Sequence, residues 1–249
     1  PCRVHAGGYA DFADCGLVIL AAGTNQRPGE TREALLGRNR AILQSILEQL
    51  TAVNRDAVLL VVSNPVDVLT GYTLELSGFP AERVIGSGTV LDTARIKCLL
   101  GEKLGVDSRN VHAFMLGEHG DSEVAVWSSA NISGADLDDF CLAAGIDDPE
   151  SMLASLAREV THAAYDIIER KGATCYGIAM AEAIIRDEHA VLPVSTLARG
   201  AYGIEGVCLG LPAVVGRSGV SRVLDLPLSR DETERLLASA HKLKTLMEG

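Results

Sequence analysis

The sequence lacks several features that define simple classes of protein. No apolar run among the 249 residues approaches the ~20 residues of a membrane-spanning helix, and no signal-peptide pattern is visible. Positive charge is scarce, because 22 Lys and Arg stand against 33 Asp and Glu, for a formal net charge of -11. We therefore expect no nucleic acid or membrane partner and a cytoplasmic protein, while an anionic small molecule is still compatible with a few local arginines.

Paired cysteines are also lacking. The six cysteines are far apart and form no C-x-x-C pair, so neither a zinc ribbon nor a redox motif is indicated, and no metal site is predicted. We expect buried, reduced thiols. The sequence contains no G-x-S-x-G and no H-E-x-x-H either, which argues against common hydrolases.

The first half alternates short apolar runs with helical patterns. LVILAAG (17–23) and AVLLVVS (57–63) predict buried strands, and residues 31–53 between them predict a long helix. A helix opening at Asn64-Pro65, a short strand, another helix and the strand NVHAFMLGE follow in order. This alternation predicts an α/β fold with a parallel sheet, in which ligands bind just past the carboxyl ends of the strands.

The second half has a different pattern. Long helices are predicted over 149–172 and 174–188, followed by β-rich runs over 190–226 with glycine turns, and then a final helix with a Ser cap. This pattern predicts an α+β domain with an antiparallel meander. We place the domains at 1–88 and 89–249, with the site in the cleft between them.

Residues 116–121 read LGEHGD and place His119 between two glycines at the end of a predicted strand. A lone histidine is more often a packed or surface residue than a catalyst. In LDTAR, however, Asp92 and Arg95 share one face of a helix start. Asp92 is either a helix cap or the carboxylate that orients His119, and Arg95 either pairs internally or binds a substrate carboxylate.

Two further segments follow predicted strands. NQRPGETR has the composition of a mobile lid, with Arg32 at a helix start where it opposes the helix dipole; a solvated surface arginine is the alternative. In VSNPVD, Asn64 either orients a polar ligand group or caps the next helix. An acid/base histidine with a carboxylate and two arginines suits proton transfer on a 2-oxo or 2-hydroxy acid.

Six segments in order carry a family resemblance: AAGTNQRPGETR, VSNPVDVLT, GSGTVLDTARIK, GEHGDSEVAVWS, RKGATCYGIA and PVSTLARGAYGI. On these segments the chain resembles the L-lactate dehydrogenases of the lactate/malate dehydrogenase family over nearly its whole length. The resemblance implies NAD-dependent interconversion of pyruvate and L-lactate in a homotetramer. Alternatives are a related enzyme for malate or 2-hydroxyisocaproate, and a catalytically silent structural oligomer.

The resemblance also implies residue roles. His119 matches the proton donor and acceptor, Asp92 its partner, Arg95 the clamp for the substrate carboxylate, and Arg32 the lid arginine that polarises the carbonyl. Gln26 matches the position at which malate enzymes carry an arginine, so dicarboxylates should be rejected. The remaining matched positions are one substrate contact, Thr174, and the cofactor contacts Tyr9, Gly23, Thr24, Ser45, Val62, Ser63, Asn64 and Ile178.

Bacterial members often bind fructose 1,6-bisphosphate through an Arg and a His. Here His112 matches the histidine, and Lys97 stands at the arginine position. The positive charge is kept and the planar guanidinium fork is lost, so phosphate binding is compatible with the sequence and activation is in question.

The family's G-x-G-x-x-G turn and its acidic ribose-binding residue are not found in this sequence, so the Rossmann-type sheet is expected to be partial. About two βα units, on the order of 60–80 residues, would complete it. Either the sequence is a piece of an ordinary enzyme, which we favour, or the chain is short, exposes a sheet edge and binds NAD poorly.

Overall fold

The computed structural model describes the backbone of residues 3–24, 32–171 and 181–248. Side chains are described over the same ranges except residues 32–33, 164–171, 181–183 and 248.

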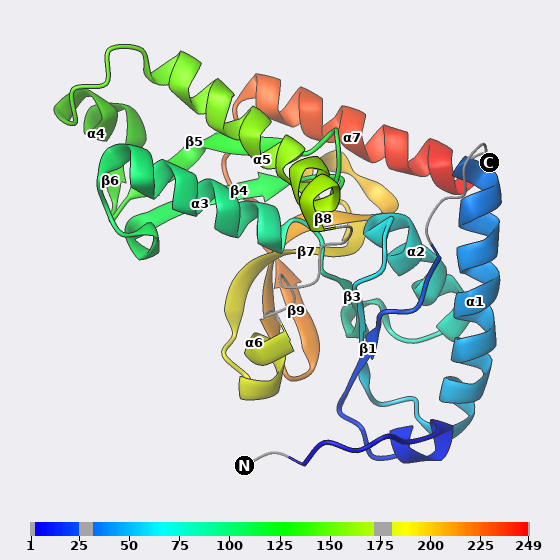
Figure 1. The fold of residues 1–249 in the computed structure, drawn as a ribbon. Helices are drawn as coiled ribbons and strands as arrows, with labels where there is room; N and C mark the ends of the chain where they lie inside the picture. The colour runs from blue at the N-terminus through cyan, green and yellow to red at the C-terminus, as the bar shows by residue number, and fades with distance from the viewer. Residues whose placement is uncertain (1–2, 25–31, 172–180, 249) are drawn as a thin grey trace.

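A six-stranded sheet forms the centre of the molecule (Figure 1). Its strands, in spatial order, are β1 (Leu17–Leu20), β2 (Val58–Val61), β3 (Val84–Gly86), β7 (Ala190–Arg199), β8 (Glu205–Gly216) and β9 (Gly219–Val223). The first three strands are parallel, and the last three form the predicted antiparallel meander. The two parts join where β3 pairs with β7 at Gly86 and Ser195. Because one sheet continues across both halves, the division into domains 1–88 and 89–249 stays a prediction.

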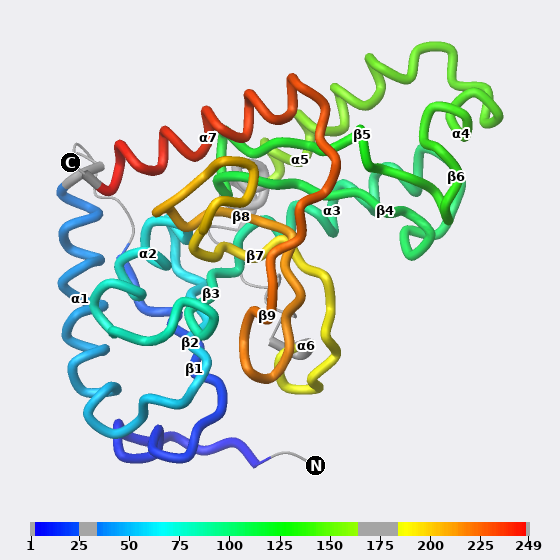
Figure 2. Tube along the Cα trace, turned by 180° about the vertical axis from the view of Figure 1, so that it is seen from behind, coloured from blue at the N-terminus to red at the C-terminus, as the bar shows by residue number. Residues whose placement is uncertain are grey.

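Both faces of the parallel strands are buried, as the continuous apolar runs predict. On one face, Leu59 and Val61 pack in a cluster with α1 (Arg32–Val53), α2 (Val66–Ser77) and α7 (Arg230–Glu248). On the other face, Val58 and Leu60 belong to a cluster that includes Ile184 of α6 (Ala181–Arg186). Residues 174–180 of the helix predicted over 174–188, and residue 172 of the helix predicted over 149–172, lie outside the described part of the chain. Figure 2 shows α1 and α7 meeting at the corner where the chain ends.

A second, three-stranded sheet contains β4 (Val111–Leu116), β5 (Val124–Ile132) and β6 (Ala135–Asp136). The expectation that β4 would extend the parallel sheet is wrong, because β4 pairs antiparallel with β5, a strand that the sequence did not predict. Three helices pack against this sheet: α3 (Val90–Leu104), α4 (Leu137–Ala143) and α5 (Pro149–Lys171). The two sheets touch at a bridge between Gly117 and Gly210, so the end of β4 still reaches the central sheet.

Short segments complete the fold. Four 3-10 helices are present in the described chain: Tyr9–Phe12, Ala81–Arg83, Ser108–Asn110 and Ala201–Gly203. The predicted cap of the last helix is confirmed, because Ser229 Oγ accepts a hydrogen bond from the backbone N–H of Glu232. Among the described residues, no helix is long and apolar enough to cross a membrane.

The expectation of uniformly buried thiols is wrong. Cys141 and Cys208 are buried and free, but Cys98 is exposed and Cys15 is half-buried. Cys98 lies on the outer side of α3, so its thiol faces solvent rather than the core.

Candidate active site

Gly117 anchors the loop that follows β4 and carries His119. Gly117 has φ +92, and a Cβ there would lie 2.8 Å from Ser239 Oγ on α7, so only glycine fits. Its N–H and carbonyl both bond to Gly210 of β8, and the next N–H, of Glu118, donates to Ser239 Oγ. The loop is therefore fixed to the central sheet and to α7 before the histidine is reached.

His119 and Asp92 are in direct contact. His119 Nδ1 donates to Asp92 Oδ2 at 2.6 Å, and Asp92 Oδ1 meets Arg95 Nη1 at 3.0 Å. Asp92 makes no capping hydrogen bond at the start of α3, where Thr89 occupies the N-cap position. The orienting contact expected from the sequence is thus present. Arg95 also forms the internal ion pair that was its alternative, while 18% of its side chain stays exposed.

A second carboxylate, Asp67, supports the backbone of the histidine. Asp67 lies in the first turn of α2, is 2% exposed, and accepts a hydrogen bond from His119 N at 2.8 Å. Burial raises the pKa of Asp67 from 3.8 to about 6, against the opposing effects of Ser195 and His119. VSNPVD drew attention to Asn64, and Asp67 was missed as a site residue because its partner is 52 residues away.

The charges around His119 favour its protonated form. Burial lowers the pKa of the imidazole, but the hydrogen bond to Asp92 and the negative charges of Asp92, Asp67 and Glu123 together raise it from 6.5 to about 9. His119 is therefore a cation at neutral pH and carries a proton that it can give to a bound ligand.

Glu123, at the start of the β5 segment, was missed from the sequence. It is 8% exposed, and Thr161 Oγ1 on α5 donates to its Oε1 at 2.8 Å. Burial, followed by the charge of Asp92, raises the pKa of Glu123 from 4.5 to about 8. One ligand atom each of Asp92, His119 and Glu123 lies within 4.8 Å of the others, a spacing that a metal ion can use, although His119 and Asp92 already engage each other. The only signal in the sequence was an acidic residue beginning an apolar run.

A cavity of about 180 Å³ opens beside His119. Pro65 and Asp67 of the first half line it together with Lys242 and Leu243 of α7. Segments far apart in the sequence therefore contribute walls to this cavity, and a cleft between two domains stays a prediction. Gln26 and Thr174 lie outside the described residues, and so does the side chain of Arg32, whose backbone begins α1.

Polar groups for a cofactor gather at the carboxyl ends of β1 and β2. Ser63 Oγ donates to the carbonyl of Ala22 at 2.8 Å, and Thr24 N donates to Asn39 Oδ1 at 2.9 Å. Gly23 lies between these two bonds, and Val62 N bonds back to Leu20 of β1. Backbone groups and hydroxyls at this edge fit a dinucleotide, which binds where parallel strands end. Asn39 is buried on α1 and holds Thr24 through this hydrogen bond. It was not identified from the sequence.

Other predicted cofactor contacts are spread out. Asn64 is exposed, and the helix that follows has Pro65 at its N-cap and no side-chain cap, so the alternative role of Asn64 as a cap is wrong. Ser45 is exposed on α1. Tyr9 packs on Phe12 before β1, at the opposite end of that strand from Gly23. Ile178 lies outside the described residues.

Lys97 and His112, the two predicted phosphate contacts, line one cavity of about 280 Å³ between α3 and β4. Pro193 of β7 forms part of its wall. The structure thus brings these two basic residues to one surface site.

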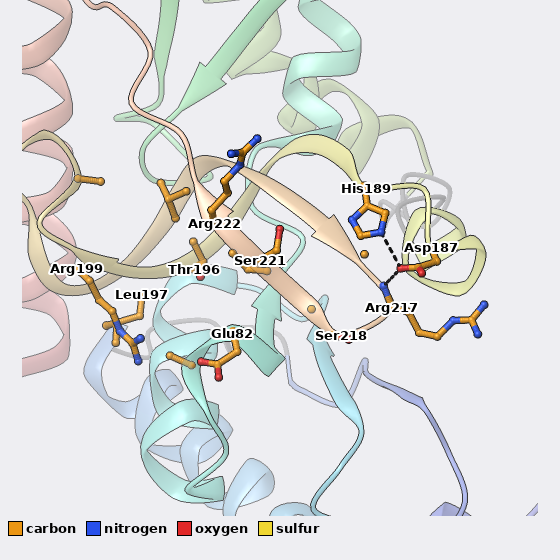
Figure 3. A pocket seen from close by; sticks show the side chains of 16 residues that line it. Glu82, Asp187, His189, Thr196, Leu197, Arg199, Arg217, Ser218, Ser221 and Arg222 are labelled. Carbon is orange, nitrogen blue, oxygen red and sulfur yellow. Dashed lines mark hydrogen bonds and ion pairs between the residues drawn. The ribbon is translucent and has the colours of Figure 1, made fainter.

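A larger cavity, of about 750 Å³, lies along the β8–β9 hairpin, and none of the predicted site residues that the structure describes lines it. Figure 3 shows that its Arg199, Arg217 and Arg222 point away from one another, while Asp187 pairs with His189 and with the backbone of Arg217. The three guanidinium groups do not converge on one ligand position.

The fold and the site together define an α/β protein with a charged His–Asp acid/base pair beside a dinucleotide-type sheet edge. Family models described as the lactate/malate dehydrogenase NAD binding domain and alpha/beta C-terminal domain match residues 1–86 and 89–249. The chain therefore belongs to the lactate/malate dehydrogenase family.

Proteins named L-lactate dehydrogenase are similar to this chain over nearly its whole length. The chain is 48% identical over 246 residues to an L-lactate dehydrogenase of Clostridium perfringens, covering 97% of this chain and 78% of that protein. It is 50% identical over 253 residues to an L-lactate dehydrogenase of Streptococcus gordonii, covering 100% of this chain and 77% of that protein. A crystal structure of the minor L-lactate dehydrogenase from Enterococcus mundtii in a ligands-bound form superposes with a TM-score of 0.92 at 42% identity, covering 97% and 78% of the two chains.

Proposed function

We propose that this protein catalyses the NAD-dependent interconversion of pyruvate and L-lactate, with His119 as the proton donor and acceptor. The observation that carries the proposal is the His119–Asp92 hydrogen bond of 2.6 Å at the edge of a cavity built from both halves of the chain. The family and its L-lactate dehydrogenase relatives supply the substrate class.

The geometry supports a simple division of roles. Because Nδ1 of His119 is bound to Asp92, Nε2 is the nitrogen that can exchange a proton with substrate. In pyruvate reduction, Nε2–H gives its proton to the carbonyl oxygen, and the Asp92 carboxylate holds the ring in one orientation. NADH, held at the carboxyl ends of β1 and β2, would supply the hydride to the keto carbon. In lactate oxidation the same nitrogen, unprotonated, takes the hydroxyl proton.

Binding of the substrate is assigned to arginines and polar groups. We propose that Arg95 holds the substrate carboxylate as a bidentate partner, with Asn64 and Thr174 as polar contacts. Arg32 polarises the carbonyl, and Gln26 rejects a second carboxylate because it offers no positive charge. At the cofactor edge we assign Gly23, Thr24, Val62 and Ser63, with Tyr9, Ser45 and Ile178 as further contacts.

The family resemblance also supports a cytoplasmic homotetramer, with α1 and α5 as contact surfaces, and a fructose 1,6-bisphosphate site at Lys97 and His112. Sedimentation equilibrium tests the homotetramer. A tetramer mass supports it, and a monomer at micromolar concentration contradicts it.

Substrate comparison tests the proposed reaction. NADH oxidation is followed with pyruvate, oxaloacetate and 2-oxoisocaproate, using His119→Asn as the inactive control. Pyruvate should give the highest kcat/KM, and His119→Asn should remove the activity. A higher kcat/KM with oxaloacetate would show that the role given to Gln26 is wrong.

A further inference from the structure

Glu123 touches neither the cavity beside His119 nor the sheet edge, yet it belongs to the same buried charge cluster. We propose that Glu123 is a positioning residue, which acts on His119 by sharing a proton with the Asp92 carboxylate. This inference rests on the proposed function of the His119–Asp92 pair and adds a residue behind that pair.

The geometry brings two carboxyl groups together inside the protein. Asp92 is 2% exposed and Glu123 is 8% exposed, and their oxygens lie within the 4.8 Å cluster that includes His119. Two buried carboxylates at this separation repel each other when both are ionised. The arrangement is relieved when one of them keeps a proton and donates it to the other, as in other paired carboxyl sites.

The neighbouring residues decide which group keeps the proton. Asp92 is held by two cations, Arg95 and His119, one on each oxygen. Glu123 forms no ion pair with any side chain that the structure describes, and its partner on α5 is the uncharged hydroxyl of Thr161. The shared proton is therefore placed on Glu123, whose pKa is raised to about 8.

Titratable groups other than Asp92 and His119 share a groove with Glu123. Glu123 also lines a groove of about 740 Å³ between β5 and α5, whose charged and titratable members are Asp121, Asp138, Glu150, Arg158, His162 and Arg235. Acidic and basic groups are mixed there, so the groove adds no dominant charge of one sign. The group that couples most directly to Glu123 is Asp92.

Two effects on His119 follow. While Glu123 is protonated, Asp92 accepts hydrogen bonds from three sides, and its orientation toward His119 is fixed. When Glu123 ionises at alkaline pH, its negative charge raises the pKa of His119 and keeps the imidazole protonated to higher pH. Glu123 thus sets both the position and the alkaline limit of the proton donor.

The test compares two substitutions. Glu123→Gln keeps a donor to Asp92 but cannot ionise, whereas Glu123→Leu keeps neither property. The pKa of His119 is measured by NMR from its Cε1–H signal, assigned with His119→Asn. It should fall by about 0.5 or more in both variants, because both lose the charge. At pH 7, kcat for pyruvate should stay within about threefold of wild type in Glu123→Gln and fall about tenfold or more in Glu123→Leu.

Glu232→Gln is the matched control, because Glu232 is another buried carboxylate on partners outside this cluster. It should leave the His119 pKa unchanged. An unchanged His119 pKa in Glu123→Gln, or equal kcat in the Gln and Leu variants, overturns the proposal. If the His119 pKa shifts as expected but wild type does not reduce pyruvate, the coupling stands and the proposed function fails.

Discussion

The imidazole of His119 and the carboxylate of Asp92 form a hydrogen bond of 2.6 Å between residues 27 positions apart in the chain. A carboxylate can only accept this bond, so it fixes the proton on Nδ1 and leaves Nε2 for substrate. Arg95 holds the other oxygen of Asp92 and prevents the carboxylate from turning away. The relationship orients the proposed proton donor before any substrate binds.

Asp92→Asn should leave the fold intact and lower kcat for pyruvate reduction by about 100-fold or more, because a neutral amide no longer favours the imidazolium. Steady-state NADH oxidation measures the loss. The control is Asp107→Asn, an exposed carboxylate paired with Arg109 away from the site, which should keep wild-type rates. Equal losses in the two variants would contradict the role given to Asp92.

Asp67→Asn should stabilise the protein at neutral pH. The wild-type carboxyl has a folded pKa of about 6 against 3.8, so the penalty for ionising it is absent below pH 3.8, grows between pH 3.8 and pH 6, and is complete above pH 6. At about 1.4 kcal/mol per pH unit, the penalty is on the order of 3 kcal/mol at pH 7 and roughly half that at pH 5. The amide oxygen still accepts from His119 N.

Urea unfolding of wild type and Asp67→Asn at pH 7 and pH 5 measures this difference. A gain in the free energy of unfolding that shrinks toward acid is expected. A variant less stable than wild type at pH 7 would mean that the ionised carboxylate stabilises the fold.

Glu232→Ala should destabilise the fold. This buried carboxylate accepts hydrogen bonds from the backbone N–H groups of Trp127, Ser128 and Ser229 and from the Ser128 hydroxyl, and so ties α7 to β5. Leaving these donors unpaired should lower the free energy of unfolding by about 2–4 kcal/mol. Glu234→Ala on the same helix, an exposed residue paired with Arg230, should change it by less than about 0.5 kcal/mol.

The pH dependence of the Glu232 contribution has a defined sign. Burial opposes ionisation of Glu232, but the hydrogen bonds from Ser128 and the neighbouring N–H groups outweigh it and lower the pKa below 4.5. The stabilisation is therefore present above pH 4.5 and is lost as the pH falls through the folded value. A Glu232→Ala penalty that grows toward acid would contradict this reading.

Fructose 1,6-bisphosphate should act through Lys97. If the cavity lined by Lys97 and His112 holds phosphate, the ligand should lower KM for pyruvate by about fivefold, and Lys97→Glu should remove that response. Lys103→Glu, on the last turn of the same helix, is the charge-matched control and should respond like wild type. No response in wild type would limit the site to a structural role.

The sequence predicts the elements whose patterns are local. The apolar run 57–63 is found as a strand buried on both faces, and the glycine-broken run 190–226 is found as the meander. β5 was missed because its second half mixes exposed and buried residues without a regular period. Because β4 pairs with β5, β4 lies outside the parallel sheet. No local pattern in NVHAFM indicates this pairing.

The same limit applies to the site. His119, Asp92 and Arg95 stand in recognisable local motifs, so sequence patterns suffice to propose them. Asp67 and Glu123 gain their significance only from burial and from neighbours on other elements, including α5 for Glu123. Charged residues that interact only in the folded protein have no characteristic spacing in the sequence, so a search for sequence motifs does not identify them.

The pH dependence of kcat/KM for pyruvate-dependent NADH oxidation tests the central claim most directly. Reduction needs protonated His119, whose folded pKa is about 9. The value of kcat/KM should therefore be constant near neutral pH. Above the His119 pKa of about 9, it should fall about tenfold per pH unit. A profile that stays level through pH 10, with wild-type stability retained, would contradict the assignment of His119 as the proton donor.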